Sequence, residues 1–328
     1  MARPKIGHFY LLFLYLPIGF LVLESLILFV WTHLLAPQIF KPPRTIINPL
    51  PNFLSPQRSF AFNLWLPDER NIFPTDLPPP KLTAESYLAI DLSSGRFLLQ
   101  KDIRKRMPVA SLVKIMTALV ALERGDLEEK IVVSKEAAQI GEDSMGVSEG
   151  EKLTLEELLW GLLLPSGNDA AEAIAQGLAG RREVFINWMN SKAREIGLKD
   201  TYFINPSGLD EEQKQYSTAY DLMVITFWAL KYPKFREIVK TPYHFIPYSK
   251  EHKAFHLFTQ VNLLRENPEV VGVKMGYTPK AGLCGVSLVK KEGREILGVV
   301  LNSKNRREDL KKLLNYSLET LNFSPSID

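Results

Sequence analysis

The sequence predicts β-strands near both ends of the part of the chain that can fold into a domain, and α-helices between them. Two apolar stretches near the start, residues 87–92 and 96–100, flank a Ser-Ser-Gly turn and predict a hairpin. Three more strands are predicted near the end, over residues 270–276, 285–289 and 295–301. Because strands bury their apolar faces by sharing a sheet, we expect an α+β domain in which the first and last strands are joined.

Apolar residues recur at helical spacing between these strands. Five helices are predicted over residues 111–122, 153–164, 169–178, 182–196 and 217–230, and an amphipathic helix over residues 306–321 follows the last strand. The chain has 328 residues, of which 46% are hydrophobic, so it can bury a sizeable core in one large domain or two modest ones.

The N-terminal residues predict a membrane anchor. Residues 9–35 are nearly all apolar, and this run exceeds the roughly 20 residues that span a bilayer as a helix. We interpret residues 1–36 as a cytoplasmic tail and an uncleaved anchor; a long cleaved signal peptide and a buried soluble helix are the alternatives. Lys and Arg are almost evenly distributed on the two sides of the run, so they do not decide its orientation.

Residues 37–82 are rich in proline and predict a semi-rigid spacer, followed by a folded domain over residues 83–322 and a short tail at 323–328. The net charge is +3 and no run of Lys or Arg is present, so a nucleic-acid partner is not expected. Neither a cofactor nor a metal is expected, because His252 and His256 have ligand spacing but no evident third ligand.

Three short polar clusters carry the candidate chemistry. The first is Ser111-Leu112-Val113-Lys114, in which the spacing of three places a hydroxyl and an amine on one helix face. Serine is a weak nucleophile that needs a base, and Lys114 can serve as that base only when its amine is neutral. Burial and a second cation would lower the pKa of Lys114. This pair supplies a nucleophile and a base for acyl transfer without histidine.

The second and third clusters are Ser166-Gly167-Asn168, after a helix break at Pro165, and Lys274-Met275-Gly276, in a strand. They add a hydroxyl and an amide for proton relay and a cation for a carboxylate. Each cluster alone is a weak signal, since a helix N-cap also fits the second one. Their order and settings together are a strong signal.

An acyl-transfer site also needs two donors for the oxyanion. The backbone N–H groups of Ser111 and Tyr277 are the candidates, and Gly276 would let a substrate backbone approach closely. The single cysteine, Cys284, cannot form an internal disulfide, and its apolar neighbours favour a packing role.

The clusters resemble the S-x-x-K, S-D-N and K-T-G set of the low-molecular-mass penicillin-binding proteins, the serine D-alanyl-D-alanine carboxypeptidases. The likeness runs from about Thr83 to Leu321. It includes residues 107–118, 143–146, 149–151, 162–171, 205–210 and 217–222. The resemblance implies a β-lactamase/DD-peptidase-like fold, in which a helical subdomain flanks an antiparallel sheet.

The resemblance also implies a reaction and its partners. The hydroxyl of Ser111 would attack the carbonyl between two D-alanines of a peptidoglycan stem peptide, and β-lactams would acylate it as substrate mimics. The catalytic domain would then lie outside the cytoplasmic membrane, on a single anchor. The implied site consists of Ser111, Lys114, Ser166 and Asn168 for catalysis, and Lys274, Gly276, Tyr277 and Thr278 for substrate binding.

Three departures from the family pattern leave other functions open. Met275 stands where the family has a threonine, residues 259–264 contain no carboxylate-binding arginine, and the sequence lacks the common C-terminal β-domain. A DD-endopeptidase acting on cross-links and a non-catalytic peptidoglycan-binding protein are therefore alternatives. A β-lactamase is a weaker one, because residues 199–209 contain no glutamate for deacylation.

Overall fold

The computed structural model describes residues 64–212, 214–323 and 327. The expected anchor at 1–36, most of the spacer at 37–82 and most of the tail at 323–328 lie outside the described residues. Among the helices that are described, none is both long and apolar enough to cross a bilayer.

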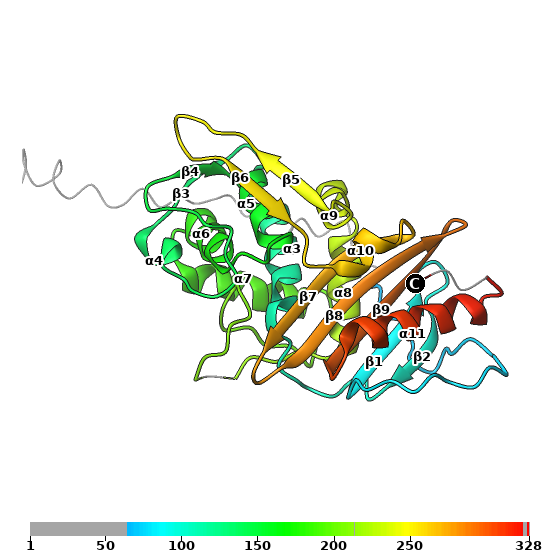
Figure 1. Cartoon of the computed structure of the whole chain (residues 1–328). Helices are drawn as coiled ribbons and strands as arrows, with labels where there is room; N and C mark the ends of the chain where they lie inside the picture. The colour runs from blue at the N-terminus through cyan, green and yellow to red at the C-terminus, as the bar shows by residue number, and fades with distance from the viewer. Residues whose placement is uncertain (1–63, 213, 324–326, 328) are drawn as a thin grey trace, which may run out of the picture. The chain divides into compact units, whose positions relative to one another are not determined.

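A five-stranded antiparallel sheet has the strand order β2-β1-β9-β8-β7 (Figure 1). Its strands are β1 (Ser86–Asp91), β2 (Arg96–Lys101), β7 (Val270–Thr278), β8 (Gly282–Lys291) and β9 (Arg294–Ser303). β1 pairs with β9 along its whole length, so the first and last strands share the sheet as predicted. β7, which carries the third polar cluster, forms one edge.

The two faces of the sheet are covered by different helices (Figure 1). The helix α11 (Arg306–Thr320) packs on one face over β8 and β9, with Leu310, Leu313 and Leu314 in the interface. The helix α8 (Ala219–Ala229) packs on the other face, against β1 and β9. This second face joins the helical part of the domain, which contains the first two polar clusters.

The helical part is built around α3 (Val113–Arg124), which packs against α5 (Leu155–Leu163), α6 (Asn168–Ala179), α7 (Arg182–Glu195) and α8. Every residue of α3 from Val113 to Ala121 is buried, as expected for a helix that is surrounded by others. Thr154 and Glu157 form a capping box that starts α5. These helices agree with the predicted ones to within a few residues.

Short elements were not predicted. Two small antiparallel pairs are present, β3 (Lys130–Val132) with β4 (Lys152–Thr154), and β5 (Tyr243–Ile246) with β6 (Phe255–Phe258). The short helices α4 (Lys135–Ala138), α9 (Pro233–Val239) and α10 (Asn262–Glu266) were also missed. Three to seven residues hold too few repeats for a periodic pattern to appear.

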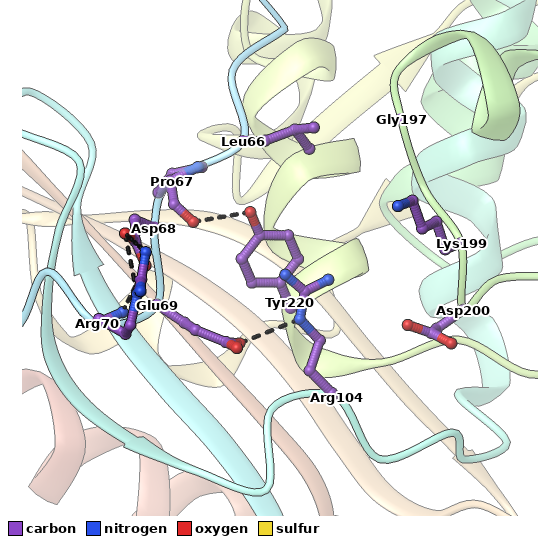
Figure 2. Close-up of a pocket in the computed structure, with 10 residues that line it drawn as sticks. All are labelled: Leu66, Pro67, Asp68, Glu69, Arg70, Arg104, Gly197, Lys199, Asp200 and Tyr220. Atoms are coloured by element: carbon purple, nitrogen blue, oxygen red, sulfur yellow. Dashed lines mark hydrogen bonds and ion pairs between the residues drawn. The ribbon is translucent and has the colours of Figure 1, made fainter.

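The end of the expected spacer packs against the domain. Trp65 stacks on Phe227 with ring centroids 3.8 Å apart, and Ile72 forms an isolated β-bridge with Phe97 of β2. Figure 2 shows the cavity of about 700 Å³ that this segment borders, where the Tyr220 hydroxyl donates to the Pro67 carbonyl oxygen at 2.8 Å. None of the eight predicted site residues lines this cavity.

Candidate active site

Ser111 and Lys114 lie at the start of the buried helix. A 3-10 turn, η2 (Ala110–Leu112), carries Ser111 and leads directly into α3. The amine nitrogen Nζ of Lys114 lies 3.0 Å from Ser111 Oγ, and it also donates to Asn168 Oδ1 at 2.7 Å and to the Ser207 carbonyl oxygen at 2.6 Å. A neutral amine would keep the last two bonds and turn its lone pair to the serine hydroxyl.

Burial makes the neutral form of Lys114 accessible. The side chain is fully buried, and desolvation lowers the pKa of Lys114 to about 7, although the carboxylates of Asp143 and Asp169 act in the opposite direction. Lys274 is also buried, and its pKa is lowered well below the usual lysine value by desolvation and by the charge of Lys114. Burial therefore accounts for the lowered pKa of Lys114, and the interaction between the two amines is seen in the lowered pKa of Lys274.

The second cluster lies in the break between α5 and α6. Ser166 has a φ of 67°, in the left-handed region, and its buried Oγ finds no hydrogen-bond partner among the described residues. Asn168 begins α6 and donates from Nδ2 to the Gly141 carbonyl oxygen at 3.0 Å. Gly167 occupies the N-cap position without a side-chain cap bond, so capping does not explain the cluster.

The third cluster lies beside the first. A Cβ atom added to Gly276 would fall 2.8 Å from the backbone nitrogen of Ser111, so β7 and η2 are in close contact there. Lys274 donates from Nζ to the Met275 carbonyl oxygen at 2.8 Å. Tyr277 follows Gly276 on the edge strand, and its side chain is exposed. The structure therefore brings Lys274 and Gly276 to the Ser111 region.

Thr278 and Met275 have other surroundings. The Thr278 hydroxyl donates to Asp210 Oδ1 at 3.0 Å, so it links β7 to the loop that contains Asp210. Met275 pairs with Gly285 across β7 and β8 and is buried in the core beneath α11. Because side chains alternate along a strand, Met275 lies on the face of the sheet opposite to Lys274.

Sequence reasoning missed Arg306, the first residue of α11. Its Nη1 donates to the Gly276 carbonyl oxygen at 2.6 Å, and its charge helps to lower the pKa of Lys274. An arginine in the first turn of a helix opposes the helix dipole. That unfavourable placement was the one signal in the sequence that could have identified this residue.

The histidines and the cysteine lie in ordinary packing positions. His252 Nε2 is 3.3 Å from Glu157 Oε1, and His256 Nδ1 is bonded to the Tyr243 hydroxyl. Within the described part of the chain, no group of three or more His, Cys, Asp or Glu residues could hold a metal ion. Burial raises the pKa of Cys284 to about 11, so its thiol is protonated at neutral pH.

The fold and the site together define a class of protein. A serine hydroxyl next to a buried amine, a second buried serine with no hydrogen-bond partner among the described residues, and a lysine on the adjoining edge strand form a serine acyl-transfer site. This class of enzyme uses lysine where serine proteases of the triad type use histidine.

Comparison with known proteins identifies the family. The family described as D-alanyl-D-alanine carboxypeptidase matches residues 74–305. The D-alanyl-D-alanine carboxypeptidase DacF of Bacillus subtilis is 34% identical over 250 residues, which cover 74% of this chain and 64% of DacF. DacB2 of Mycobacterium tuberculosis, which carries the same enzyme name, is 36% identical over 222 residues, covering 67% of this chain and 75% of DacB2.

A solved structure agrees with these matches. The crystal structure of the Streptomyces K15 DD-transpeptidase superposes with a TM-score of 0.70 and 30% identity, covering 74% of this chain and all of the other. The chain therefore belongs to the D-alanyl-D-alanine carboxypeptidase family of serine peptidases, and the family predicted from the sequence is confirmed. The match spans just under two thirds of the length of DacF.

Proposed function

We propose that this protein is a serine D-alanyl-D-alanine carboxypeptidase that acts on peptidoglycan stem peptides. The observation that carries the proposal is the distance of 3.0 Å between Lys114 Nζ and Ser111 Oγ, with an amine whose pKa is lowered to about 7 by burial. The family match and the DD-carboxypeptidase names of its relatives support the same activity.

The reaction begins when Lys114 takes the hydroxyl proton of Ser111. The serine oxygen bonds to the carbonyl carbon between the two D-alanines, and the resulting oxyanion lies toward the backbone N–H groups of Ser111 and Tyr277. The C–N bond then breaks, and the proton returns to the leaving amine through the Ser166 hydroxyl. Water cleaves the ester in the second half of the reaction, with Lys114 again as the base.

Substrate recognition would use the cations at the end of β7. Lys274 and Arg306 both lie at the third cluster, where they would bind the terminal carboxylate of the peptide. The arriving carboxylate would raise the pKa of Lys274 again. A cavity of about 420 Å³, lined in part by Ala110, Gly208 and Leu209, gives space beside the nucleophile for the rest of the peptide.

Mass spectrometry of a stem pentapeptide after incubation with the enzyme tests this function. Loss of one alanine, with labelling of the wild type by a penicillin and no labelling of Ser111→Ala, is the expected result. Equal labelling of the two proteins would reject the acyl-enzyme at Ser111. Peptide binding without release of alanine would identify a non-catalytic binding protein instead.

A transfer or endopeptidase activity is the second candidate. The structural relative from Streptomyces is named a DD-transpeptidase. The test should therefore ask whether an amine, as well as water, accepts the acyl group from Ser111. Incubation with a dipeptide acceptor and with a cross-linked peptide dimer separates the three reactions by product mass. A transpeptide, a cleaved dimer or a shortened pentapeptide would each identify one reaction.

We also propose that residues 9–35 anchor the protein in the cytoplasmic membrane, with the catalytic domain outside. The length and apolar character of this run support an anchor. Fractionation of cells that express the full chain or a chain lacking residues 1–36 tests the anchor, and protease treatment of intact spheroplasts tests the side. Full-length chain in the soluble fraction would contradict the proposal.

A further inference from the structure

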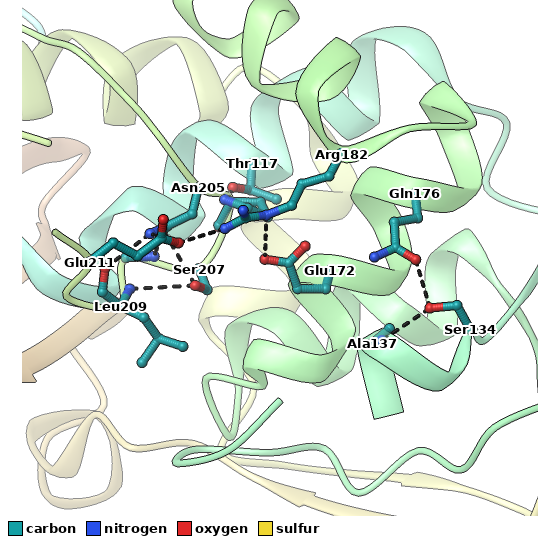
Figure 3. Close-up of polar contacts among 12 residues, drawn as sticks. Thr117, Ser134, Ala137, Glu172, Gln176, Arg182, Asn205, Ser207, Leu209 and Glu211 are labelled. Carbon is teal, nitrogen blue, oxygen red and sulfur yellow. Dashed lines mark hydrogen bonds and ion pairs between the residues drawn. The ribbon is translucent and has the colours of Figure 1, made fainter. Parts of the chain in front are cut away.

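Arg182, the first residue of α7, bridges the carboxylates of Glu172 and Glu211 (Figure 3). Its Nε donates to Glu172 Oε1 at 3.1 Å, and its Nη2 donates to Glu211 Oε1 at 2.6 Å. Glu172 lies on α6, the helix that begins at Asn168, while Glu211 ends a loop over residues 205–211, here named the carbonyl loop. Arg182 therefore ties the carbonyl loop to α6, the helix that begins at Asn168 of the second cluster.

The carbonyl loop contacts both groups of the first cluster. The carbonyl oxygen of Ser207 accepts from Lys114 Nζ at 2.6 Å. Gly208 has a φ of 91°, and a Cβ atom there would fall 2.1 Å from the Ala110 carbonyl oxygen and 3.0 Å from the Ser111 nitrogen. The loop thus fixes the amine of the base and supports the backbone that presents the nucleophile.

The bridge reaches the centre of the carbonyl loop through a buried amide. Asn205 donates from Nδ2 to Glu211 Oε1 at 2.9 Å, and its Oδ1 accepts from the Gly208 nitrogen at 2.7 Å. On the inner side, the Thr117 hydroxyl of α3 donates to the Pro206 carbonyl oxygen at 2.6 Å. The loop is therefore held by α3, by the arginine bridge and, through the bond from Thr278 to Asp210, by β7.

We propose that Arg182 is a positioning residue for acyl transfer: by bridging Glu172 and Glu211, it holds the carbonyl loop against Lys114 and Ser111. This role rests on the proposed function. An arginine suits it, because the planar guanidinium can reach two carboxylates at once, whereas a lysine offers a single compact charge. The side chain of Glu172 is only 4% exposed and that of Arg182 is 33% exposed, so solvent screens this contact less than a surface ion pair.

The bridge also bears on the protonation of the base. Four carboxylates raise the pKa of Lys114: Glu142 and Asp143 on the loop between α4 and β4, and Asp169 and Glu172 on α6. The charge of Lys114 in turn lowers the pKa of Lys274 on β7. Burial nevertheless dominates and lowers the pKa of Lys114. A loosened carbonyl loop would let water reach the amine, and the pKa of Lys114 would rise toward its usual range.

The test compares Arg182→Gln with Arg181→Gln, a matched control whose side chain is 75% exposed. The rate constant for acylation by a fluorescent penicillin is measured across the neutral pH range. We expect Arg182→Gln to reduce this rate about tenfold near neutrality. We also expect it to move the acid limb of the profile to higher pH, because the base must be neutral to react. Arg182→Lys should recover part of the rate, and Arg181→Gln should follow the wild type.

A second measurement does not depend on activity. Hydrogen–deuterium exchange of the peptide that covers the carbonyl loop should be faster in Arg182→Gln than in the wild type, and unchanged in Arg181→Gln. If Arg182→Gln does not fold, Glu211→Gln removes the loop side of the bridge. We expect it to move the acid limb to higher pH and to speed exchange of the carbonyl loop, by smaller amounts than Arg182→Gln.

Two outcomes overturn the proposal. One is an acid limb at the wild-type pH in a folded Arg182→Gln variant, since a purely structural loss would lower the rate equally at every pH. The other is unchanged exchange of the carbonyl loop. A wild type that does not react with penicillin would instead reject the proposed function, and the exchange data would still decide whether Arg182 holds the loop.

Discussion

Arg306 donates to the backbone carbonyl of Gly276 at 2.6 Å, which places a cation from the last helix on the third polar cluster. The family pattern has a carboxylate-binding arginine before the last strand, but residues 259–264 of this chain contain none. Arg306 approaches the same strand from α11, on which it is the first residue. Lys274 and Arg306 therefore bring two basic side chains to the third cluster on β7.

Replacement of Arg306 should weaken substrate recognition. Loss of a charge-assisted hydrogen bond amounts to about 1.5–3 kcal/mol, so Arg306→Gln should lower kcat/KM for a stem peptide by about tenfold to a hundredfold. The neighbouring Arg307 pairs with Glu266 and is exposed, which makes Arg307→Gln the matched control. Steady-state kinetics on the pentapeptide measure both variants, and equal losses in the two would show that Arg306 has no special role.

The rate of acylation should depend on the protonation of Lys114. Since the pKa of Lys114 is lowered to about 7 and the neutral amine is the base, the rate should rise as the pH rises through about 7. Stopped-flow measurement of penicillin acylation at several pH values checks this. A rate that stays constant through the neutral range would mean that another group is the base.

The lowered pKa of Lys114 should also make the free energy of unfolding depend on pH. The pKa of Lys114 is lower in the folded state than in the unfolded chain, so between these two values the unfolded chain binds more protons. The free energy of unfolding should therefore rise with pH in this window. From about pH 7 to about pH 9, the wild type should gain about 2 kcal/mol relative to Lys114→Met, measured by urea unfolding. Parallel curves for the two proteins would contradict the lowered pKa.

Restoring the family threonine should not improve the enzyme. Met275 is buried beneath α11 beside Gly285, so Met275→Thr would remove packed atoms and bury a hydroxyl. We expect a loss of about 2–3 kcal/mol in the free energy of unfolding. Acylation by penicillin, measured at a temperature where both proteins are folded, should not increase. A clear gain in rate would show that the hydroxyl can reach the site.

Long periodic elements were predictable from the sequence, and so was the nucleophile segment. The spacing of three residues predicts that the Ser111 and Lys114 side chains meet, because side chains at i and i+3 lie on the same face of a helix. The start of the helix was less predictable. Ala110 has a φ of 50°, which breaks the regular helix, so Ser111 lies in a 3-10 turn before α3.

The remaining contacts of the site depend on tertiary structure. Ser207 acts through a backbone carbonyl, which every residue has, so its side chain gave no signal. Gly208 lies against Ala110, and this proximity appears only when the chain is folded. The family pattern predicts a threonine at Met275 but says nothing of its orientation, which follows from the strand register with β8.

The pairing of β1 with β9 has a consequence for biosynthesis. Asp91 lies opposite Ile296, so about 200 residues must be translated before the first hairpin can meet its partner. Contacts between such distant segments slow folding, and the nascent β1 edge stays uncovered during that interval. A chain whose translation ends before β9 would therefore keep β1 without its partner strand, and such a fragment would be prone to aggregation. We expect fragments of this kind to be degraded rapidly.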